Sequence, residues 1–453
     1  MSLVVRAGVL VTGTGEQLES GWLRSRHGEI VEIGAGPAPA AGEVLDLPNC
    51  VMVAGLVNTH DHMYQWATRG YAQRSGLFGW LKELYPVWAQ IDAEIVRAAA
   101  RAAIGRLLLA GCTLTTDHHY VFPAGRPGLF EALVEAGQDL GIRFHPCRGS
   151  MDLGESDGGL PPDSVVEELD QILAETERVV ARYHDARPGA MLRVAVAPCS
   201  PFSVTPRLMT ESAALARRLG VHLHTHLAET VDEEEYCLAK FGRRPLELLE
   251  EWGWLGSDVW VAHGVHFSKE EVAELGRTRT GIAHCPSSNM RLGAGACPTA
   301  DLFAAGARVG LGVDGAASNE DYDLLAEVHQ ALLLARLRAS MLGAPAPAEA
   351  LSPEGAFALG NRGGAAVLGR GDLGTLELGK RADLALYRVD DLGRGGIEDP
   401  LAAIALAPPA RAEAVVVEGR VVVREGRLLT ADEEELAREI RHASVRLQAV
   451  ARG

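Results

Sequence analysis

The sequence predicts an α/β protein, a (β/α)8 TIM-type barrel with a small β-sandwich domain built from both chain ends. Through the middle of the chain, helical segments alternate with short apolar runs, and a glycine often separates the two. This is the pattern of β/α units. Both ends instead contain short, valine-rich strands separated by turns. The 453 residues leave room for a barrel of about 250 residues and a second domain.

The domain boundaries follow from where these two patterns change. We predict that residues 1–54 and 366–430 form the composite β-sandwich, that 55–365 form the barrel, and that 431–453 form a C-terminal helix. A doubly wound sheet would give the same local rhythm of helices and strands. The choice of a barrel therefore also depends on the residues found at the strand ends.

Helices of the central region carry clear start and stop signals. One is predicted over residues 92–111, which begin with a capping aspartate and finish with a glycine. Thr205 can cap a second helix that has Pro206 in its first position and ends at Gly220. An apolar run follows each of these helices, as a β/α repeat requires.

Two further helices continue the repeat. Ser268 and Glu271 form a capping box, and Gly276 is expected to close the helix that follows it. The run 299–305 is predicted to be helical and to stop at Gly306, before the next apolar strand.

Composition and charge exclude several classes of function. The chain has 60 acidic and 43 basic side chains, a formal net charge of −17, so a nucleic-acid partner is not expected. No apolar stretch approaches the ~18 residues of a membrane span. The seven cysteines form no CxxC pair, which favours a reducing compartment. With no export signal at the start, we expect a cytoplasmic protein and no membrane partner.

Histidines and an aspartate lie where the predicted strands end. His60 and His62 follow one apolar run, His226 and His263 end two later ones, and Asp314 ends another. In a barrel the carboxyl ends of all strands meet on one face, where active sites are found. His60 and His62 are two residues apart, so both side chains can point the same way from an extended segment.

Three imidazoles and a carboxylate would form a mixed nitrogen and oxygen site. Such a site suits zinc, or iron or manganese in the same geometry. Taken singly, each residue has an ordinary explanation, because histidine pairs are common on surfaces and in cores and an aspartate after a strand often caps a helix. The runs HTHLAE, VAHG and VGLGVDG each follow an apolar strand, in that order. Their conjunction favours a functional site.

Motifs along almost the whole chain resemble the amidohydrolase superfamily, in the branch of cytosine, guanine and adenosine-type deaminases and triazine hydrolases. They are AGLVNTHDHMYQ (54–65), HTHLAET (224–230), WVAHGVHF (260–267), HCPSSNMRL (284–292), GLGVDGAASN (310–319) and GTLELGKRADLALY (374–387). The resemblance implies a metal-dependent hydrolase that acts on C–N bonds in cyclic amidines.

Residue by residue, the resemblance implies a ligand set and two further catalytic groups. The metal ligands would be His60, His62, His226 and Asp314, and the catalytic residues Glu229, His263 and Asp314. Glu229 would shuttle protons and His263 would help to polarise the hydrolytic water. Binuclear relatives need a bridging lysine after the fourth strand, and the corresponding run LRVAVAPCSPFS has none. We therefore expect one divalent ion, Zn²⁺ first and Fe²⁺ as the alternative.

Within this branch the chain is most similar to 8-oxoguanine deaminases. The supporting segments are LFGWLKELYPVWAQ (77–90), TTDHHYVFP (115–123) and RFHPCRGSMDLGESDGGLPPDS (143–164). This implies conversion of 8-oxoguanine to urate and ammonia. Many 8-oxoguanine deaminases have a histidine in place of Asp61, so guanine, isoguanine, adenosine-type compounds and triazines (chloro or alkylamino) stay open as substrates.

Four residues are candidates for contact with a small heterocyclic substrate. Gln65 and Trp66 follow the metal-binding histidines, and His119 lies at a predicted strand end, where His118 is an equal candidate. Arg148 could donate two hydrogen bonds to a purine carbonyl, or form a structural ion pair. From the resemblance we expect a homodimer or higher homo-oligomer.

Overall fold

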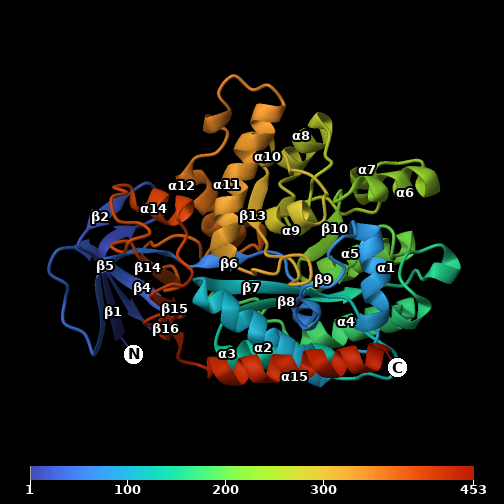
Figure 1. Cartoon of the computed structure of the whole chain (residues 1–453), viewed down its shortest axis with the longest axis horizontal. Coiled ribbons are helices and arrows are strands. Elements are labelled where there is room, and N and C mark those ends of the chain that lie inside the picture. The colour runs from blue at the N-terminus through green and yellow to red at the C-terminus, as the bar shows by residue number, and fades with distance from the viewer. Residues whose placement is uncertain (1, 453) are drawn as a thin grey trace.

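The computed structural model describes residues 2–452. Met1 and Gly453, the outermost residues of the predicted terminal ranges, lie outside them. Eight parallel strands form a closed barrel, which confirms the predicted fold class (Figure 1). The strands follow one another in chain order, and the barrel closes where Leu311 of the last strand pairs with Asn58 of the first. The barrel strands are β6 (Leu56–Asn58), β7 (Cys112–His119), β8 (Arg143–Ser150), β9 (Ala195–Pro198), β10 (Leu223–Leu227), β11 (Val259–His263), β12 (Gly281–His284) and β13 (Arg308–Leu311).

Helices follow the barrel strands as β/α units require. None of those within residues 2–452 combines the length and apolar character needed to cross a bilayer. They are α1 (Leu77–Trp88), α2 (Ala93–Leu109), α3 (Leu129–Leu140), α4 (Leu169–Tyr183), α5 (Pro206–Leu219), α6 (Val231–Phe241), α7 (Pro245–Glu251), α8 (Lys269–Thr278), α9 (Pro286–Arg291), α10 (Thr299–Ala304), α11 (Leu324–Met341), α12 (Pro353–Ala358), α13 (Gly364–Val367), α14 (Pro400–Leu406) and α15 (Glu433–Arg452).

Both chain ends contribute to one mixed sheet beside the barrel, as predicted (Figure 1). Strand β5 joins its two parts, since it pairs with β1 in parallel and with β14 in antiparallel register. The sheet has an apolar core of its own, which includes Leu10, Met52 and Leu384. Its strands are β1 (Ser2–Val11), β2 (Gln17–Glu19), β3 (Gly21–Arg26), β4 (Glu29–Ala35), β5 (Glu43–Ala54), β14 (Leu384–Arg388), β15 (Ala414–Val417), β16 (Arg420–Arg424) and β17 (Arg427–Leu428).

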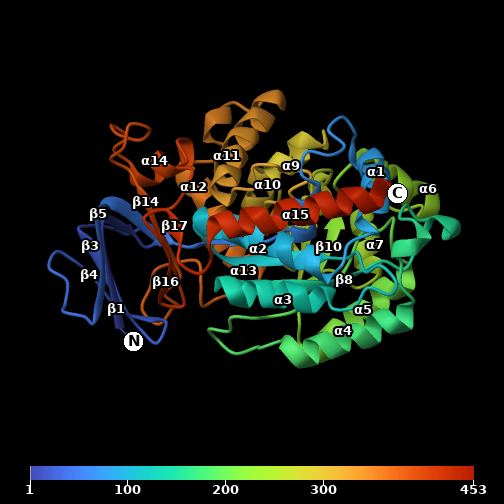
Figure 2. The same ribbon diagram turned by 60° about the horizontal axis from the view of Figure 1, so that its bottom comes forward.

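The C-terminal helix α15 lies along α2 on the outside of the barrel (Figure 2). Arg446 of α15 reaches Asp92 at 2.7 Å, and Arg101 of α2 reaches Glu439 at 3.1 Å. These ion pairs lie along the contact between the two helices.

The predicted helix caps are confirmed at two helices and wrong at the end of a third. The side chain of Asp92 caps α2 and that of Thr205 caps α5. Helix α8 begins at the predicted capping box but continues past Gly276 to Thr278. A Cβ on Gly276 would lie 2.1 Å from the Ala305 carbonyl oxygen, so this glycine permits close packing rather than ending the helix.

A buried ion pair links the barrel to the terminal sheet. Arg143 of β8 donates to both carboxylate oxygens of Asp383, at 2.6 and 2.9 Å, and also pairs with Glu418. The side chains of Arg143 and Asp383 are almost fully buried. Removing one partner of such a pair leaves an uncompensated charge in a low-dielectric interior.

We therefore expect Arg143→Met to lower the free energy of unfolding by roughly 3–5 kcal/mol. The matched control is Arg6→Met, which removes an exposed ion pair with Asp46 and should cost less than about 1 kcal/mol. Urea denaturation followed by circular dichroism measures both. Equal effects of the two substitutions would contradict a linking role for Arg143.

Candidate metal centre and active site

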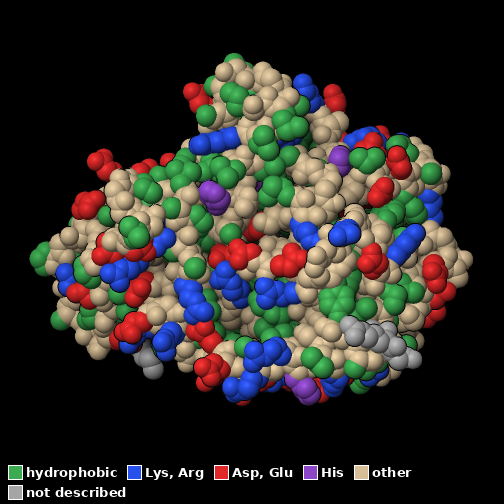
Figure 3. Space-filling view, in the orientation of Figure 1, with side chains coloured by type: hydrophobic (Ala, Val, Ile, Leu, Met, Phe, Trp, Pro, Cys, Tyr) green, Lys and Arg blue, Asp and Glu red, His purple; other side chains and the backbone are tan. Residues whose placement is uncertain are grey.

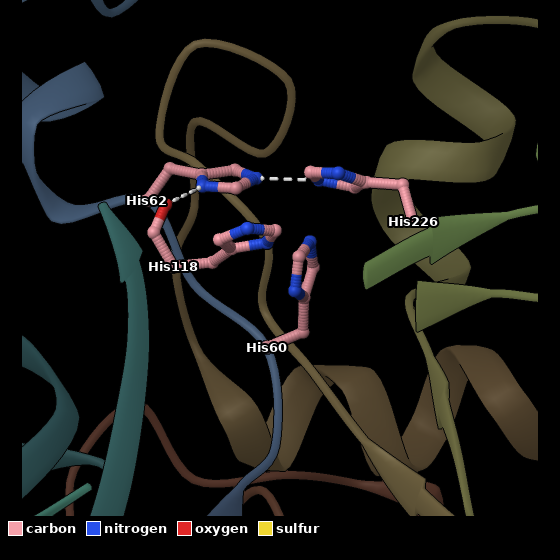
Figure 4. A group of neighbouring side chains, drawn as sticks. All are labelled: His60, His62, His118 and His226. Carbon is pink, nitrogen blue, oxygen red and sulfur yellow. Dashed lines mark hydrogen bonds between the residues drawn. The ribbon is translucent and has the colours of Figure 1, made fainter. Parts of the chain in front are cut away.

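The four predicted metal ligands meet at the carboxyl end of the barrel. The Nε2 atoms of His62 and His226 lie 3.0 Å apart. Asp314 Oδ1 lies 3.4 Å from the Nε2 atoms of both His60 and His62. Figure 4 shows the three ligand imidazoles with that of His118 beside them. His60 and His62 come from one segment and His226 from another, and the ligand rings point toward a common centre. All four side chains are buried.

Hydrogen bonds on the far side of each ring fix which nitrogen faces the centre. His62 Nδ1 lies 2.7 Å from the His118 carbonyl oxygen, and His226 Nδ1 lies 2.6 Å from that of Cys199. A carbonyl only accepts, so both Nδ1 atoms carry the proton and both Nε2 atoms keep a lone pair.

The same reasoning extends to His60 through a relay of two rings. His224 Nδ1 donates to the Trp260 carbonyl at 3.0 Å, which leaves His224 Nε2 as an acceptor. His60 Nδ1 donates to it at 2.8 Å. His60 Nε2 therefore keeps its lone pair, and it has no hydrogen-bond partner within the described residues.

These residues fit a divalent metal ion. Burial lowers the pKa of His60, His62 and His226 below the ordinary histidine range, so the rings are neutral. Three lone pairs and a carboxylate at this separation repel one another unless a cation lies among them. Neutral imidazoles with a carboxylate are ligands that zinc and similar metals prefer.

Two site residues at or just after the ends of barrel strands have strained backbone conformations. His263 and Asp314 have φ values of 73° and 59°, a region that residues other than glycine rarely adopt. Asp314 Oδ2 accepts hydrogen bonds from the hydroxyls of Ser288 (2.6 Å) and Ser318 (3.1 Å). These contacts hold Oδ1 of the same carboxylate toward the histidines.

Glu229 and His263 stand next to the ligands. Glu229 Oε2 lies 3.5 Å from His263 Nε2, and His263 Nδ1 donates to Asn289 Oδ1 at 3.0 Å. Burial, with the nearby charges of Asp314 and Glu233, raises the pKa of Glu229 well above its ordinary value. A carboxyl group that keeps its proton near neutral pH can act as a general acid.

A small cavity lies over the metal centre and is covered by α1. Trp80 and Tyr85 of this helix form part of its wall. Polar lining residues other than the ligands include Gln65, Ser200, Glu229 and His263. The described residues that line the cavity include no lysine or arginine.

Of the four predicted substrate contacts, one lines this cavity and three lie outside it. Gln65 lines it. Trp66 packs against the ring of Tyr322, and His119 packs against that of Phe122. Neither is among the lining residues.

Arg148 lies in a surface groove beside the site rather than in the cavity. It forms a two-point ion pair with Glu167, with distances of 2.7 and 3.1 Å. Its guanidinium stacks 3.8 Å above the centre of the Phe122 ring. Of the two roles considered for Arg148, this geometry matches the structural ion pair.

The sequence analysis left His118 and His119 as equal candidates and missed Glu233 as a supporting side chain. His118, rather than its neighbour His119, lies against the ligands, with its ring stacked 4.8 Å from that of His226. Glu233 accepts hydrogen bonds from two backbone amides, one of them that of Glu229 itself. Alternation along β7 implies that only one of the two histidines faces inward, but the sequence alone does not fix the register.

We expect Asp314→Asn to lose nearly all turnover while the protein stays folded, because an amide of similar size supplies no negative charge to the metal and accepts no proton. Turnover is measured by product release, and folding by circular dichroism. His329→Gln is a suitable control, since this partly buried histidine of α11 contacts a backbone carbonyl away from the site. A substantial residual rate in Asp314→Asn would refute its role.

Comparison with known proteins adds independent findings. Residues 51–422 match the family described as "Amidohydrolase family". The chain is 48% identical to 8-oxoguanine deaminase of Pseudomonas aeruginosa, over 90% of each chain. It is 39% identical to isoxanthopterin deaminase of an unknown prokaryotic organism, over 91% of this chain and 89% of that one. The zinc complex of atrazine chlorohydrolase from Arthrobacter aurescens TC1 superposes with a TM-score of 0.92, at 32% identity over 98% of this chain and 100% of the other.

Proposed function

The chain belongs to the amidohydrolase family, and we propose that it is a metal-dependent deaminase that hydrolyses 8-oxoguanine to urate and ammonia. One observation carries the proposal: three imidazole lone pairs and the Asp314 carboxylate converge beside a buried proton donor, Glu229. The similarity to 8-oxoguanine deaminase of Pseudomonas aeruginosa supports the choice of substrate.

The mechanism assigns a proton-handling task to each side chain. His60, His62, His226 and Asp314 would hold the metal, which supplies Lewis acidity and lowers the pKa of a water molecule toward neutrality. Glu229 donates its proton to the ring nitrogen beside the amino-bearing carbon, so that carbon accepts water more readily. His263 Nε2, an acceptor because Nδ1 of the same ring donates to Asn289, would orient the water, and Asp314 accepts the proton that the water loses. That proton then passes to the amino group, which leaves as ammonia when the C–N bond breaks, and the new hydroxyl returns a proton to Glu229. Such acid–base assistance contributes roughly 10²–10⁴-fold.

The character of the cavity favours a neutral, flat and compact substrate. Aromatic walls such as Trp80 and Tyr85 suit a planar ring. The absence of lysine and arginine among the described lining residues gives no partner to a carboxylate or phosphate. The cover formed by α1 favours a free base over a nucleoside. Gln65, whose Oε1 atom has no hydrogen-bond partner among the described residues, can pair with an amide edge of an oxopurine.

Other ring substrates remain candidates of the same site. Guanine, isoguanine and adenosine-type compounds need the same chemistry, and a triazine hydrolase would act on chloro or alkylamino groups. The structural similarity to atrazine chlorohydrolase supports a triazine as the second candidate substrate, after 8-oxoguanine. Trp66, His119 and Arg148 stay proposed substrate contacts, although they lie on the 3-10 helix after β6 and on strands β7 and β8, outside the cavity wall.

The setting of the enzyme is also part of the proposal. Zinc is the preferred metal, since the atrazine chlorohydrolase binds it. All seven cysteines are free and buried, which suits the cytoplasm. The face in Figure 3 intersperses basic side chains with acidic ones, so a nucleic-acid partner is not proposed. A homodimer or higher homo-oligomer is expected.

We expect Glu229→Gln to keep its metal and lose activity by about 10²–10⁴-fold, because glutamine keeps the size of the side chain but has no acidic proton to transfer to the substrate. Elemental analysis gives the metal content and ammonia release gives the rate. Glu271→Gln, in a capping box outside the cavity, is the control. Loss of the metal from Glu229→Gln would overturn the assignment.

Substrate choice is tested by ammonia or chloride release from a panel of purine bases, their nucleosides, pterins and triazines. We expect kcat/KM for 8-oxoguanine to exceed that for every other compound by at least about 10-fold, because polar groups left unpaired by a poorer substrate cost transition-state stabilisation. The Glu229→Gln protein gives the background rate. Faster turnover of a nucleoside or a triazine would replace the proposed substrate.

A further inference from the structure

A closed ring of hydrogen bonds lies directly behind the metal ligands. Asp61 accepts one hydrogen bond from the hydroxyl of Tyr322 and another from Asn58 Nδ2 at 3.0 Å. Asn58 Oδ1 accepts from the Val313 N–H at 2.9 Å. The Val313 carbonyl accepts from Asn319 Nδ2 at 2.9 Å, and Asn319 Oδ1 accepts from the Tyr322 N–H at 3.3 Å. This last contact returns to Tyr322 and closes the ring.

The orientation of each amide in this hydrogen-bond ring is fixed. Asn58 donates its second amide hydrogen to Thr115 Oγ1 at 3.0 Å. Asn319 donates its second hydrogen to Glu327 at 2.9 Å. Turning either amide over would place donor against donor. Because all ring members are buried, water does not compete for these hydrogen bonds.

The hydrogen-bond ring spans the seam where the barrel closes. Asp61 lies between the ligands His60 and His62, and Val313 immediately precedes the ligand Asp314. Across this seam the Asp314 N–H donates to the His60 carbonyl at 3.1 Å. Three of the four ligands therefore belong to the two backbone segments that the ring ties together.

Asp61 and Tyr322 close this connection with side chains alone. Neither lines the cavity, so neither is placed to touch a substrate. Tyr322 has a φ of 54°, an unfavourable conformation for a tyrosine, and the ring of Trp66 covers it at 4.8 Å. The backbone strain is offset by the contacts that this conformation allows.

We propose that Asp61 and Tyr322 are positioning residues that set the affinity of the metal centre, by holding His60 and His62 at a fixed separation from Asp314. The inference rests on the proposed metal-dependent function. Its physical basis is pre-organisation: ligands that are already in place do not have to be ordered when the ion binds. Partners behind metal ligands typically change metal affinity by roughly 10–100-fold.

The test is the dissociation constant for Zn²⁺, measured on metal-free protein by competition with a chromogenic chelator. Tyr322→Phe removes one hydroxyl and opens the ring, and we expect Zn²⁺ to bind about 10-fold more weakly. Tyr387→Phe is the matched control. Tyr387 belongs to β14 of the terminal sheet, and its buried hydroxyl donates to the Ala110 carbonyl at 2.8 Å. The Tyr387→Phe variant should therefore lose stability without loss of Zn²⁺ affinity.

A double-mutant cycle tests whether the two residues act through one connection. Asp61→Asn keeps an acceptor for Tyr322 but places an amide hydrogen against that of Asn58, so it opens the same ring at the next link. If the ring acts as a unit, the dissociation constant of the double variant for Zn²⁺ should not exceed that of whichever single variant binds Zn²⁺ more weakly.

The possible results separate the two proposals. Wild-type protein that binds no Zn²⁺ would overturn the proposed function itself. Wild-type protein that binds Zn²⁺ while Tyr322→Phe binds it equally well would overturn the positioning role only. Equal weakening in Tyr322→Phe and Tyr387→Phe, or fully additive losses in the double variant, would also overturn it.

Discussion

Mutual repulsion among three imidazole lone pairs and one carboxylate is the constraint on which the rest of this structure depends. Unpaired in water, these groups would turn apart. Here they are buried, with His62 Nε2 at 3.0 Å from His226 Nε2 and Asp314 Oδ1 at 3.4 Å from the Nε2 atoms of His60 and His62. A cation relieves the repulsion, but only if the protein holds the ligands close before the ion arrives. The barrel meets that need, because strands that end on one face bring His60, His226 and Asp314 together from distant parts of the chain.

The surroundings of the ligands show how this arrangement is maintained. Carbonyl oxygens and His224 bind the outer nitrogen of each ring, so only a lone pair can face inward. Serine hydroxyls fix one oxygen of Asp314. The hydrogen bond between Tyr322 and Asp61 helps to tie the segment that carries Asp314 to the segment that carries His60. Each connection costs conformational entropy that the buried hydrogen bonds offset. The strained φ values at His263 and Asp314 are part of the same construction.

Burial that suits a metal also sets the proton chemistry. The same low-dielectric environment lowers the pKa of the histidines, which favours the neutral form that a ligand needs, and raises the pKa of Glu229, which favours the protonated form that the proposed general acid needs. The chemistry of the metal and that of the acid are therefore not separate features, because both follow from placing these groups at the closed mouth of one barrel.

The sequence by itself determined the fold class and indicated the four residues that are proposed as metal ligands. Helix caps at Asp92 and Thr205 and a regular helix and strand rhythm depend on local interactions, which are readable along the chain. The choice between neighbours was different. Strand register and partners far away in the chain decide whether His118 or His119 lies against the proposed ligands. They also decide whether Arg148 forms an ion pair with Glu167. Only the tertiary structure decided these points, because such contacts exist only once the barrel has closed.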